Sequence, residues 1–324
     1  MQEMMLARAK ALLQSGDVQR VLGWQTGEFV YDVTPAAFET AEELDAKFVY
    51  NDFCGSNLSK YLVKESRKEG RVLVFLKPCD TYSFNQLIKE HRIVRENIYV
   101  IGVPCAGKTD GETLKALGLK GILDVKDAGD SFTVDTLYGE KTVSKQEALP
   151  ERCRSCKSHK HMVYDELLGE EGEVLDSHRF DMVEKIESMS ADERFAFWQG
   201  ELSRCIRCNA CRNVCPACTC EKCVFDNEHS GIAQKAAADS FEESMFHIIR
   251  AFHVAGRCTD CGECSRVCPQ NIPLHLLNRK FIKDINTFYG AYQAGEDTES
   301  RAPLTNYTKG DVESSIVYHK GGEK

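Results

Sequence analysis

The sequence contains two copies of one closely spaced cysteine pattern. The first copy spans residues 205–216 and reads CIRCNACRNVCP, and the second spans residues 258–269 and reads CTDCGECSRVCP. The two-residue steps keep three thiols on one tight loop, and the proline after the fourth cysteine prevents a helix from continuing. A loop that carries three thiols in this way is suited to fold around an iron–sulfur cubane.

This spacing is that of bacterial two-cluster ferredoxins, in which each cubane takes three cysteines from one run and the fourth from the other. The sequence therefore predicts two 4Fe-4S clusters. Cluster A is predicted to be held by Cys205, Cys208, Cys211 and Cys268. Cluster B is predicted to be held by Cys258, Cys261, Cys264 and Cys215. Zinc is disfavoured because zinc sites usually present cysteines as separated pairs, and disulfide frameworks belong to short secreted chains.

Length, charge and cysteine use limit the compartment and the partners. A chain of 324 residues with 42% hydrophobic residues can bury a core in two or three domains. Its net charge of -9 argues against nucleic acid as a partner. The first residues lack the apolar core of a secretory signal, and no apolar run is long enough to span a membrane. With 16 cysteines, these features predict a cytoplasmic protein in a reducing compartment.

The N-terminal part has the pattern of an open α/β sheet. Residues 71–76 and 97–101 form apolar runs typical of buried parallel strands, and residues 81–94 between them have helical spacing. Strand, helix and strand make a right-handed crossover unit. Each run is followed by a Pro-Cys pair, at Cys79 and at Cys105. Ligands bind beyond the carboxyl ends of such strands, so both thiols are expected at one edge.

Four cysteines outside the ferredoxin segment are expected to converge at this edge. The sheet-edge cysteines are Cys79, Cys105, Cys153 and Cys156. They suit a third 4Fe-4S cluster in a reducing compartment, with a structural zinc as the alternative. Cys54 could replace Cys79, lie beside a flavin, or be a buried inert thiol.

Three further cysteines, Cys218, Cys220 and Cys223, have no assigned role. With Cys54 they would make a fourth set of four by count. A packed thiol cluster and an additional zinc site are the alternatives.

The chain divides into three predicted segments. Residues 1–190 form the α/β domain, and residues 191–290 form a mainly helical dicluster ferredoxin domain whose halves are separated by 42 residues, 216–257. Helices are expected over residues 191–203, 239–253 and 274–289. His247 and His253 in the second of these helices are interpreted as packing or surface residues. Residues 291–324 are predicted to be a polar arm.

Residues 50–280 resemble the beta-subunit family of coenzyme F420-reducing hydrogenase and formate dehydrogenase, with bacterial relatives in heterodisulfide-reductase-like complexes. The matching motifs are LKPCD at 76–80, IGVPCAG at 101–107, the C-x2-C loop at 153–156 and RCIRCNAC at 204–211. The resemblance implies that the sheet-edge cysteines hold an iron–sulfur cluster near a flavin. The dicluster segment is also similar to that of the anaerobic sulfite reductase A subunit and the sulfhydrogenase beta subunit.

Three functions are compatible with these features. The first is an iron–sulfur electron-transfer subunit of an anaerobic oxidoreductase complex, with other redox subunits as partners; it needs no catalytic nucleophile or acid–base residue of its own. The second is a reductase subunit that binds FAD and exchanges electrons with a nicotinamide or deazaflavin. No G-x-G-x-x-G run follows a strand, although the family resembled does not use that fingerprint. The third is a metal-stabilised interaction module without a redox role.

Overall fold

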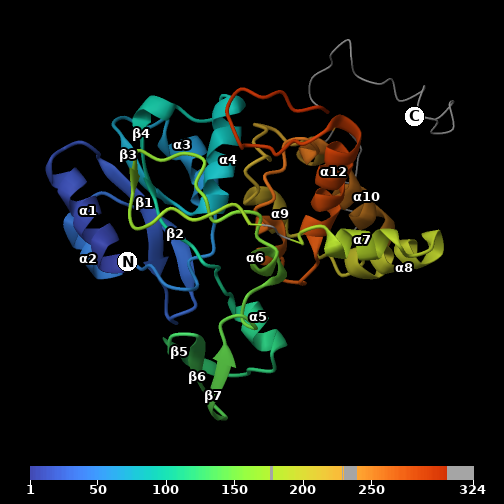
Figure 1. The fold of residues 1–324 in the computed structure, drawn as a ribbon, viewed down its shortest axis with the longest axis horizontal. Helices are drawn as coiled ribbons and strands as arrows, with labels where there is room; N and C mark the ends of the chain where they lie inside the picture. Colours follow the sequence, from blue (N-terminus) through green and yellow to red (C-terminus); the bar gives the residue numbers. More distant parts are fainter. Residues whose placement is uncertain (176–177, 228, 230–238, 305–324) are drawn as a thin grey trace.

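A computed structural model describes residues 1–175, 178–227, 229 and 239–304, and Figure 1 shows their arrangement. The N-terminal part contains a five-stranded sheet in the order β2-β1-β3-β4-β8. Its strands are β1 (Arg20–Thr26), β2 (Val33–Phe38), β3 (Val72–Leu76), β4 (Ile98–Gly102) and β8 (Glu166–Leu167). Strand β2 pairs antiparallel with β1, and the other pairs are parallel. The predicted α/β character of this part is confirmed.

Short helices flank this sheet and complete its core. They are α1 (Gln2–Gln14), α2 (Ala41–Lys47), α3 (Leu62–Glu65) and α4 (Pro78–Lys89), with the 3-10 turns η1 (Leu58–Tyr61) and η2 (Arg95–Asn97). All five residues of β3 are fully buried, as expected for a continuous apolar run in a parallel sheet. Met5 and Leu12 of α1 pack into the same core.

Helix α4 begins three residues earlier than its apolar spacing indicates. Pro78 occupies the first turn, where a missing N–H costs no hydrogen bond. The Asp80 carboxylate accepts the backbone N–H of Lys77 at 3.3 Å and closes the helix start. Cys79 therefore lies in the first turn of a helix, directly after β3.

A small antiparallel sheet follows β4. It consists of β5 (Ile122–Asp127), β6 (Ser131–Thr136) and β7 (Gly139–Ser144), and helix α5 (Gly111–Ala116) precedes it. Phe132 and Val134 of β6 pack against Leu114 of α5 in a core of their own. The hairpin between β6 and β7 turns at Leu137 and Tyr138. Helix α6 (Glu151–Arg154) then returns the chain to the edge of the larger sheet.

The C-terminal part is helical. It contains α7 (Asp181–Glu187), α8 (Ala191–Leu202), α9 (Ala210–Asn213), the 3-10 turn η3 (Val224–Asp226), α10 (Ser240–Val254), α11 (Glu263–Arg266) and α12 (Leu274–Tyr289). The helices predicted over 191–203, 239–253 and 274–289 correspond to α8, α10 and α12. No helix in the described ranges is long and apolar enough to cross a membrane. From residue 305 onward, the predicted polar arm lies outside the described residues.

Helix α4 lies between the large sheet and the C-terminal helices (Figure 1). Ser83 of α4 hydrogen-bonds to Thr259 at 2.8 Å, and both side chains are buried. The backbone N–H of Asn57 donates to Glu263 Oε2 at 3.1 Å. These contacts fix the second cysteine run against the carboxyl edge of the sheet.

Candidate metal centres

One cavity at the carboxyl edge of the sheet contains the four sheet-edge cysteines. Cys79 follows β3, Cys105 follows β4, and Cys153 and Cys156 come from α6 and the residues after it. The four thiols line this cavity together with Asp260 and Cys261 of the second ferredoxin run and Arg279 of α12. The structure therefore brings together the four cysteines that the sequence placed at this edge.

The electrostatics of this cavity fit a bound metal centre. Burial is the main cause that raises the pKa of the Cys79 thiol, and the negative charge of the Asp80 carboxylate raises it further. Burial also raises the pKa of Cys105, and the ammonium groups of Lys108 and Lys77 offset part of this rise. Without a metal, these buried thiols would stay neutral. A coordinated metal would deprotonate them and supply the positive charge that buried thiolates need.

Cys54 lies outside this cavity. Its side chain is fully buried in the core of the large sheet. Its Sγ accepts the backbone N–H of Asn51 at 3.2 Å and lies 3.6 Å from the carbonyl oxygen of Val49. The structure thus brings Cys79, rather than Cys54, to the other sheet-edge thiols.

A second cavity contains the cysteines predicted for cluster B. It is lined by Cys215, Cys258, Cys261 and Cys264. The first of these comes from the other cysteine run, as the ferredoxin pattern predicts. Asn278 of α12 lies at the same cavity, and its Nδ2 donates to Cys264 Sγ at 3.7 Å. Asp260 and Cys261 line both this cavity and the sheet-edge cavity, so the two thiol sets are neighbours.

The cysteines predicted for cluster A also lie together. Burial raises the pKa of the Cys211 thiol, Arg250 lowers it, and negative charge on Cys268 and Cys208 would raise it further. Burial raises the pKa of Cys205 to about 12, and Cys211 is among the groups that contribute. Among these four, Cys208 is exposed to solvent.

The two cysteine runs share an unusual backbone conformation. In the first run Arg207 and Asn209 have φ of 53° and 63°, and in the second Asp260 and Gly262 have φ of 58° and 69°. These are equivalent positions in the two runs. Arg207 and Asp260 each precede a cysteine, and Asn209 and Gly262 each precede a short helix that contains the next cysteine. The backbone N–H of Arg207 donates to Cys205 Sγ at 3.3 Å. Residues with positive φ in such loops turn successive backbone N–H groups toward the inside of the loop. This arrangement is suited to an anionic cluster bound there.

Comparison with known proteins agrees with this arrangement. Residues 201–272 match the 4Fe-4S dicluster domain family. The F420-dependent formate dehydrogenase subunit beta of Methanocaldococcus jannaschii is 26% identical over 92% of each chain. The F420-dependent formate dehydrogenase 1 subunit beta of Methanococcus maripaludis is 24% identical over 91% of each chain. The chain is thus similar to these two beta subunits over almost its whole length.

A solved structure, of the F420-reducing [NiFe] hydrogenase complex from Methanosarcina barkeri, also aligns with this chain. That alignment has a TM-score of 0.38 and 11% identity, and it covers 61% of this chain and 85% of the other. The dicluster domain and the relatives together identify an iron–sulfur electron-transfer subunit of an oxidoreductase complex, as the sequence predicted.

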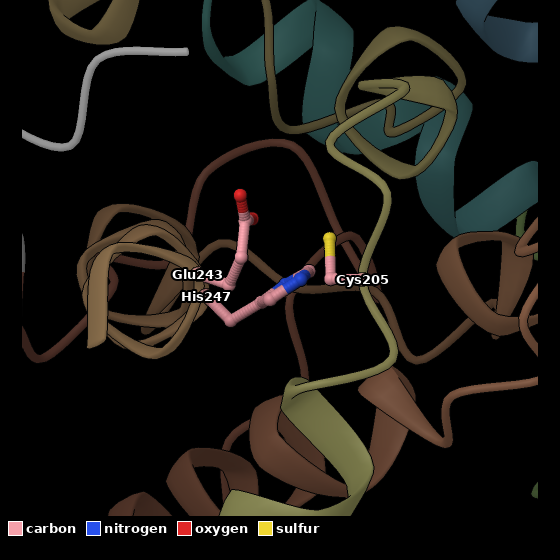
Figure 2. A group of neighbouring side chains, drawn as sticks. All are labelled: Cys205, Glu243 and His247. Carbon is pink, nitrogen blue, oxygen red and sulfur yellow. The ribbon is translucent and has the colours of Figure 1, made fainter. Parts of the chain in front are cut away.

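Beside the cysteines predicted for cluster A, the chain has a buried polar group that the sequence did not predict. Figure 2 shows Glu243 and His247, one turn apart on α10, next to Cys205. Their ligand atoms lie within 4.8 Å of one another. His247 is 2% exposed, and neither ring nitrogen has a hydrogen-bond partner in the described part of the chain. Burial, with nearby Arg250 and Arg207, lowers the pKa of His247 to about 3, so the imidazole is neutral.

The interpretation of His247 as a satisfied packing residue was therefore incomplete. The signal in the sequence is the four-residue spacing of Glu243 and His247, which places both side chains on one helix face. It could not show that this face is turned toward Cys205, because more than 30 residues separate the two segments. Glu243 also forms a buried ion pair with Arg207 at 3.2 Å.

Proposed function

We propose that the chain is the beta subunit of a formate dehydrogenase type complex and that it relays single electrons between partner subunits. The proposal assigns a four-iron cluster to each of three cysteine sets: the cluster A set, the cluster B set and the sheet-edge set. When bound, such clusters supply one-electron redox chemistry. We propose a formate dehydrogenase type of complex because both relatives are beta subunits of F420-dependent formate dehydrogenases.

The observation that carries the proposal is the succession of the three sets. Asp260 and Cys261 line both the sheet-edge cavity and the cluster B cavity. On the other side of the cluster B set, Cys264 packs in one buried cluster with Cys211 of the cluster A set, so these two sets are also adjacent. The sets therefore follow one another from the sheet edge through cluster B to cluster A.

Side chains that lie between the sheet-edge set and the cluster B set keep the two sets next to each other. They also limit the access of water to the space between these sets. Arg152, next to the sheet-edge cysteine Cys153, lies 3.8 Å from Glu263, and both side chains are less than 10% exposed. Lys157 Nζ donates to the carbonyl oxygen of Thr259, which follows the cluster B cysteine Cys258. These contacts connect the loops of the two sets directly, so they position one set relative to the other.

An FAD-bearing reductase is the second candidate, and one feature favours it. A further cavity meets the sheet-edge cavity at Gly107 and is lined by Thr109, Phe132 and Lys145. Gly107 has φ of 122°, and a Cβ there would lie 2.5 Å from Leu149. A partly exposed glycine backbone near an aromatic ring and a cation is suited to a flavin next to the sheet-edge cysteines.

Iron, sulfide, zinc and flavin analysis of anaerobically purified protein tests these proposals. The relay requires at least about twelve irons per chain, four for each four-thiol set. One flavin per chain in addition would support the reductase. Zinc without iron would contradict both and leave a metal-stabilised interaction module.

The cluster A and cluster B assignments predict separate losses. Cys211 is 7% exposed and Cys264 is 5% exposed, and each belongs to a different set. We expect Cys211→Ala and Cys264→Ala each to remove one signal from the low-temperature EPR spectrum of the reduced protein, because a cubane lacking one thiolate is not retained. The sheet-edge set should remain in both variants. Retention of every signal in both proteins would contradict the assignment.

His247 is expected to influence the reduction potential of cluster A. A polar imidazole beside Cys205 stabilises the more negative, reduced state of a cluster held there. Its replacement in His247→Phe should lower the midpoint potential of one cluster by about 40 mV, which corresponds to a contribution of about 1 kcal/mol. EPR-monitored redox titration measures this shift. His178→Phe is the control because that side chain is 86% exposed, and an equal shift there would exclude a local effect.

A further inference from the structure

Three cysteines remain outside the assigned sets: Cys218, Cys220 and Cys223. All three line one open cavity, and His253, in the last turn of α10, lines it as well. The His253 ring lies 6.2 Å from the ring of Phe225, which follows Cys223 by two residues. Thiolates and imidazoles are common ligands of iron–sulfur and zinc centres. The fold therefore brings four metal-binding side chains to one cavity.

These thiols do not have the surroundings of a packed thiol cluster. Cys220 is exposed, and Cys218 and Cys223 are only partly buried. Inert cysteines, in contrast, are among the most buried residues of proteins. Cys54, which would complete four thiols by count, is enclosed in the core of the large sheet. His253 supplies the fourth ligand in its place.

The cavity is rich in positive charge. Its cationic lining residues are Lys60, Arg212, Arg250 and Arg257, and its acidic ones are Glu221 and Asp226. Arg250 is 3% exposed, and its Nε has no hydrogen-bond partner among the residues that the structure describes. A buried guanidinium nitrogen without a partner is unfavourable. Thiolates at this cavity would add negative charge beside Arg250, whose Nη2 already donates to the carbonyl oxygen of Cys211 at 3.0 Å.

Among the described residues, the ligand atoms at this cavity are not gathered as tightly as a single zinc ion would hold them. Within the described ranges, the one group of three or more ligand atoms within 4.8 Å is Cys205, Glu243 and His247. The thiols of the three assigned sets do not form such tight groups, and neither do those of residues 218–223. Zinc at about 2.3 Å from each sulfur would draw its ligands into that range, whereas a four-iron core keeps them farther apart.

We propose that Cys218, Cys220, Cys223 and His253 hold a fourth four-iron cluster. This inference rests on the proposed electron-transfer function and extends it. The backbone N–H of Cys218 donates to the carbonyl oxygen of Cys215, a member of the cluster B set, at 3.1 Å. The fourth centre would thus lie between cluster B and the surface near Cys220, where it would give the relay an outlet toward a partner's redox group.

Metal analysis of the full-length protein, purified anaerobically, tests the proposal. The unaltered chain should contain about sixteen irons and sixteen sulfides, four for each of four clusters. A variant with Cys218→Ser, Cys220→Ser and Cys223→Ser together should contain about twelve of each. Cys54→Ser is the matched control and should keep the full content. His253→Ala should alter the EPR spectrum of one cluster, and His253→Cys should restore that cluster with a changed spectrum.

The iron and zinc contents of these proteins separate a failure of the fourth centre from a failure of the relay. About twelve irons in both the unaltered chain and the triple variant would overturn the fourth centre and leave the three-cluster relay intact. Loss of one zinc, rather than four irons, would overturn the assignment of a cluster. Fewer than about twelve irons in the unaltered chain would contradict the proposed relay itself. If the triple variant does not fold, the His253 variants still test the proposed ligand set. An unchanged EPR spectrum in His253→Ala would contradict that set.

Discussion

Replacing Cys105 with serine in the full-length chain is expected to remove about four irons and four sulfides, the content of one four-iron cluster. Cys105 follows β4 and lines the sheet-edge cavity with three other thiols. Serine is a poor ligand for a cubane, and three remaining thiolates would not retain it against competing water. We also expect partial loss of the broad visible absorbance, and no change in the signals of clusters A and B.

Cys54→Ser is the matched control for this experiment. Cys54 is buried in the same half of the chain, but its Sγ accepts a hydrogen bond from Asn51 and does not line the cavity. It should therefore keep its full iron content and absorbance. Iron loss in Cys54→Ser combined with full retention in Cys79→Ser would move the ligand set to Cys54. One zinc and no iron lost from Cys105→Ser would identify a structural zinc at the sheet edge.

The dicluster segment could be predicted because the cysteines that define it are close together in the sequence. Each run carries three cysteines on one loop, and the ferredoxin pattern specifies that Cys215 crosses to the other set. The left-handed residues Asn209 and Gly262 agree with this, since asparagine and glycine adopt that conformation most readily. Asp260 shares part of that preference, but Arg207 has the same conformation without it, and composition alone does not reveal this.

The sheet-edge set was predictable for a different reason. Two strands of a parallel sheet deliver their carboxyl ends to one edge, so Cys79 and Cys105 had to be neighbours once the strands were recognised. Strand β8 was not recognised, because two residues at Glu166–Leu167 carry no periodic signal. The C-terminal wall of the cavity was also missed. Contacts between residues more than 100 positions apart leave no pattern in a single sequence.

The principal example of such a contact is Arg279 of α12. Its side chain is 1% exposed, and its Nε donates to Asp260 Oδ1 at 2.7 Å. Its Nη1 donates to Glu151 Oε1 and to Ser155 Oγ, each at 2.8 Å. The arginine thus connects α12, the second ferredoxin run and the loop that carries the sheet-edge cysteines. Asp260 is buried, which raises its pKa, but Arg279, Lys157 and Arg179 outweigh burial and lower it.

We therefore expect Arg279→Met to destabilise the protein by about 3–5 kcal/mol, the range found when one partner of a buried ion pair is removed. Methionine fills much of the space but leaves Asp260 and Glu151 without their shared partner. Denaturant unfolding of the anaerobic, cluster-loaded protein, followed by fluorescence and by visible absorbance, measures the change. Bleaching of the sheet-edge signal should precede global unfolding, because Arg279 lines that cavity.

Arg204→Met provides the matched control. Arg204 follows the C-terminal end of α8 and pairs with Glu201 in the last turn of that helix, and its side chain is 45% exposed. An exposed pair of this kind contributes less than about 1 kcal/mol. Equal stability losses in the two variants would show that the buried contacts of Arg279 contribute no more than an exposed ion pair, which would contradict this prediction. A larger loss in Arg279→Met, with early bleaching at the sheet edge, would show that this arginine holds the sheet-edge and cluster B loops together.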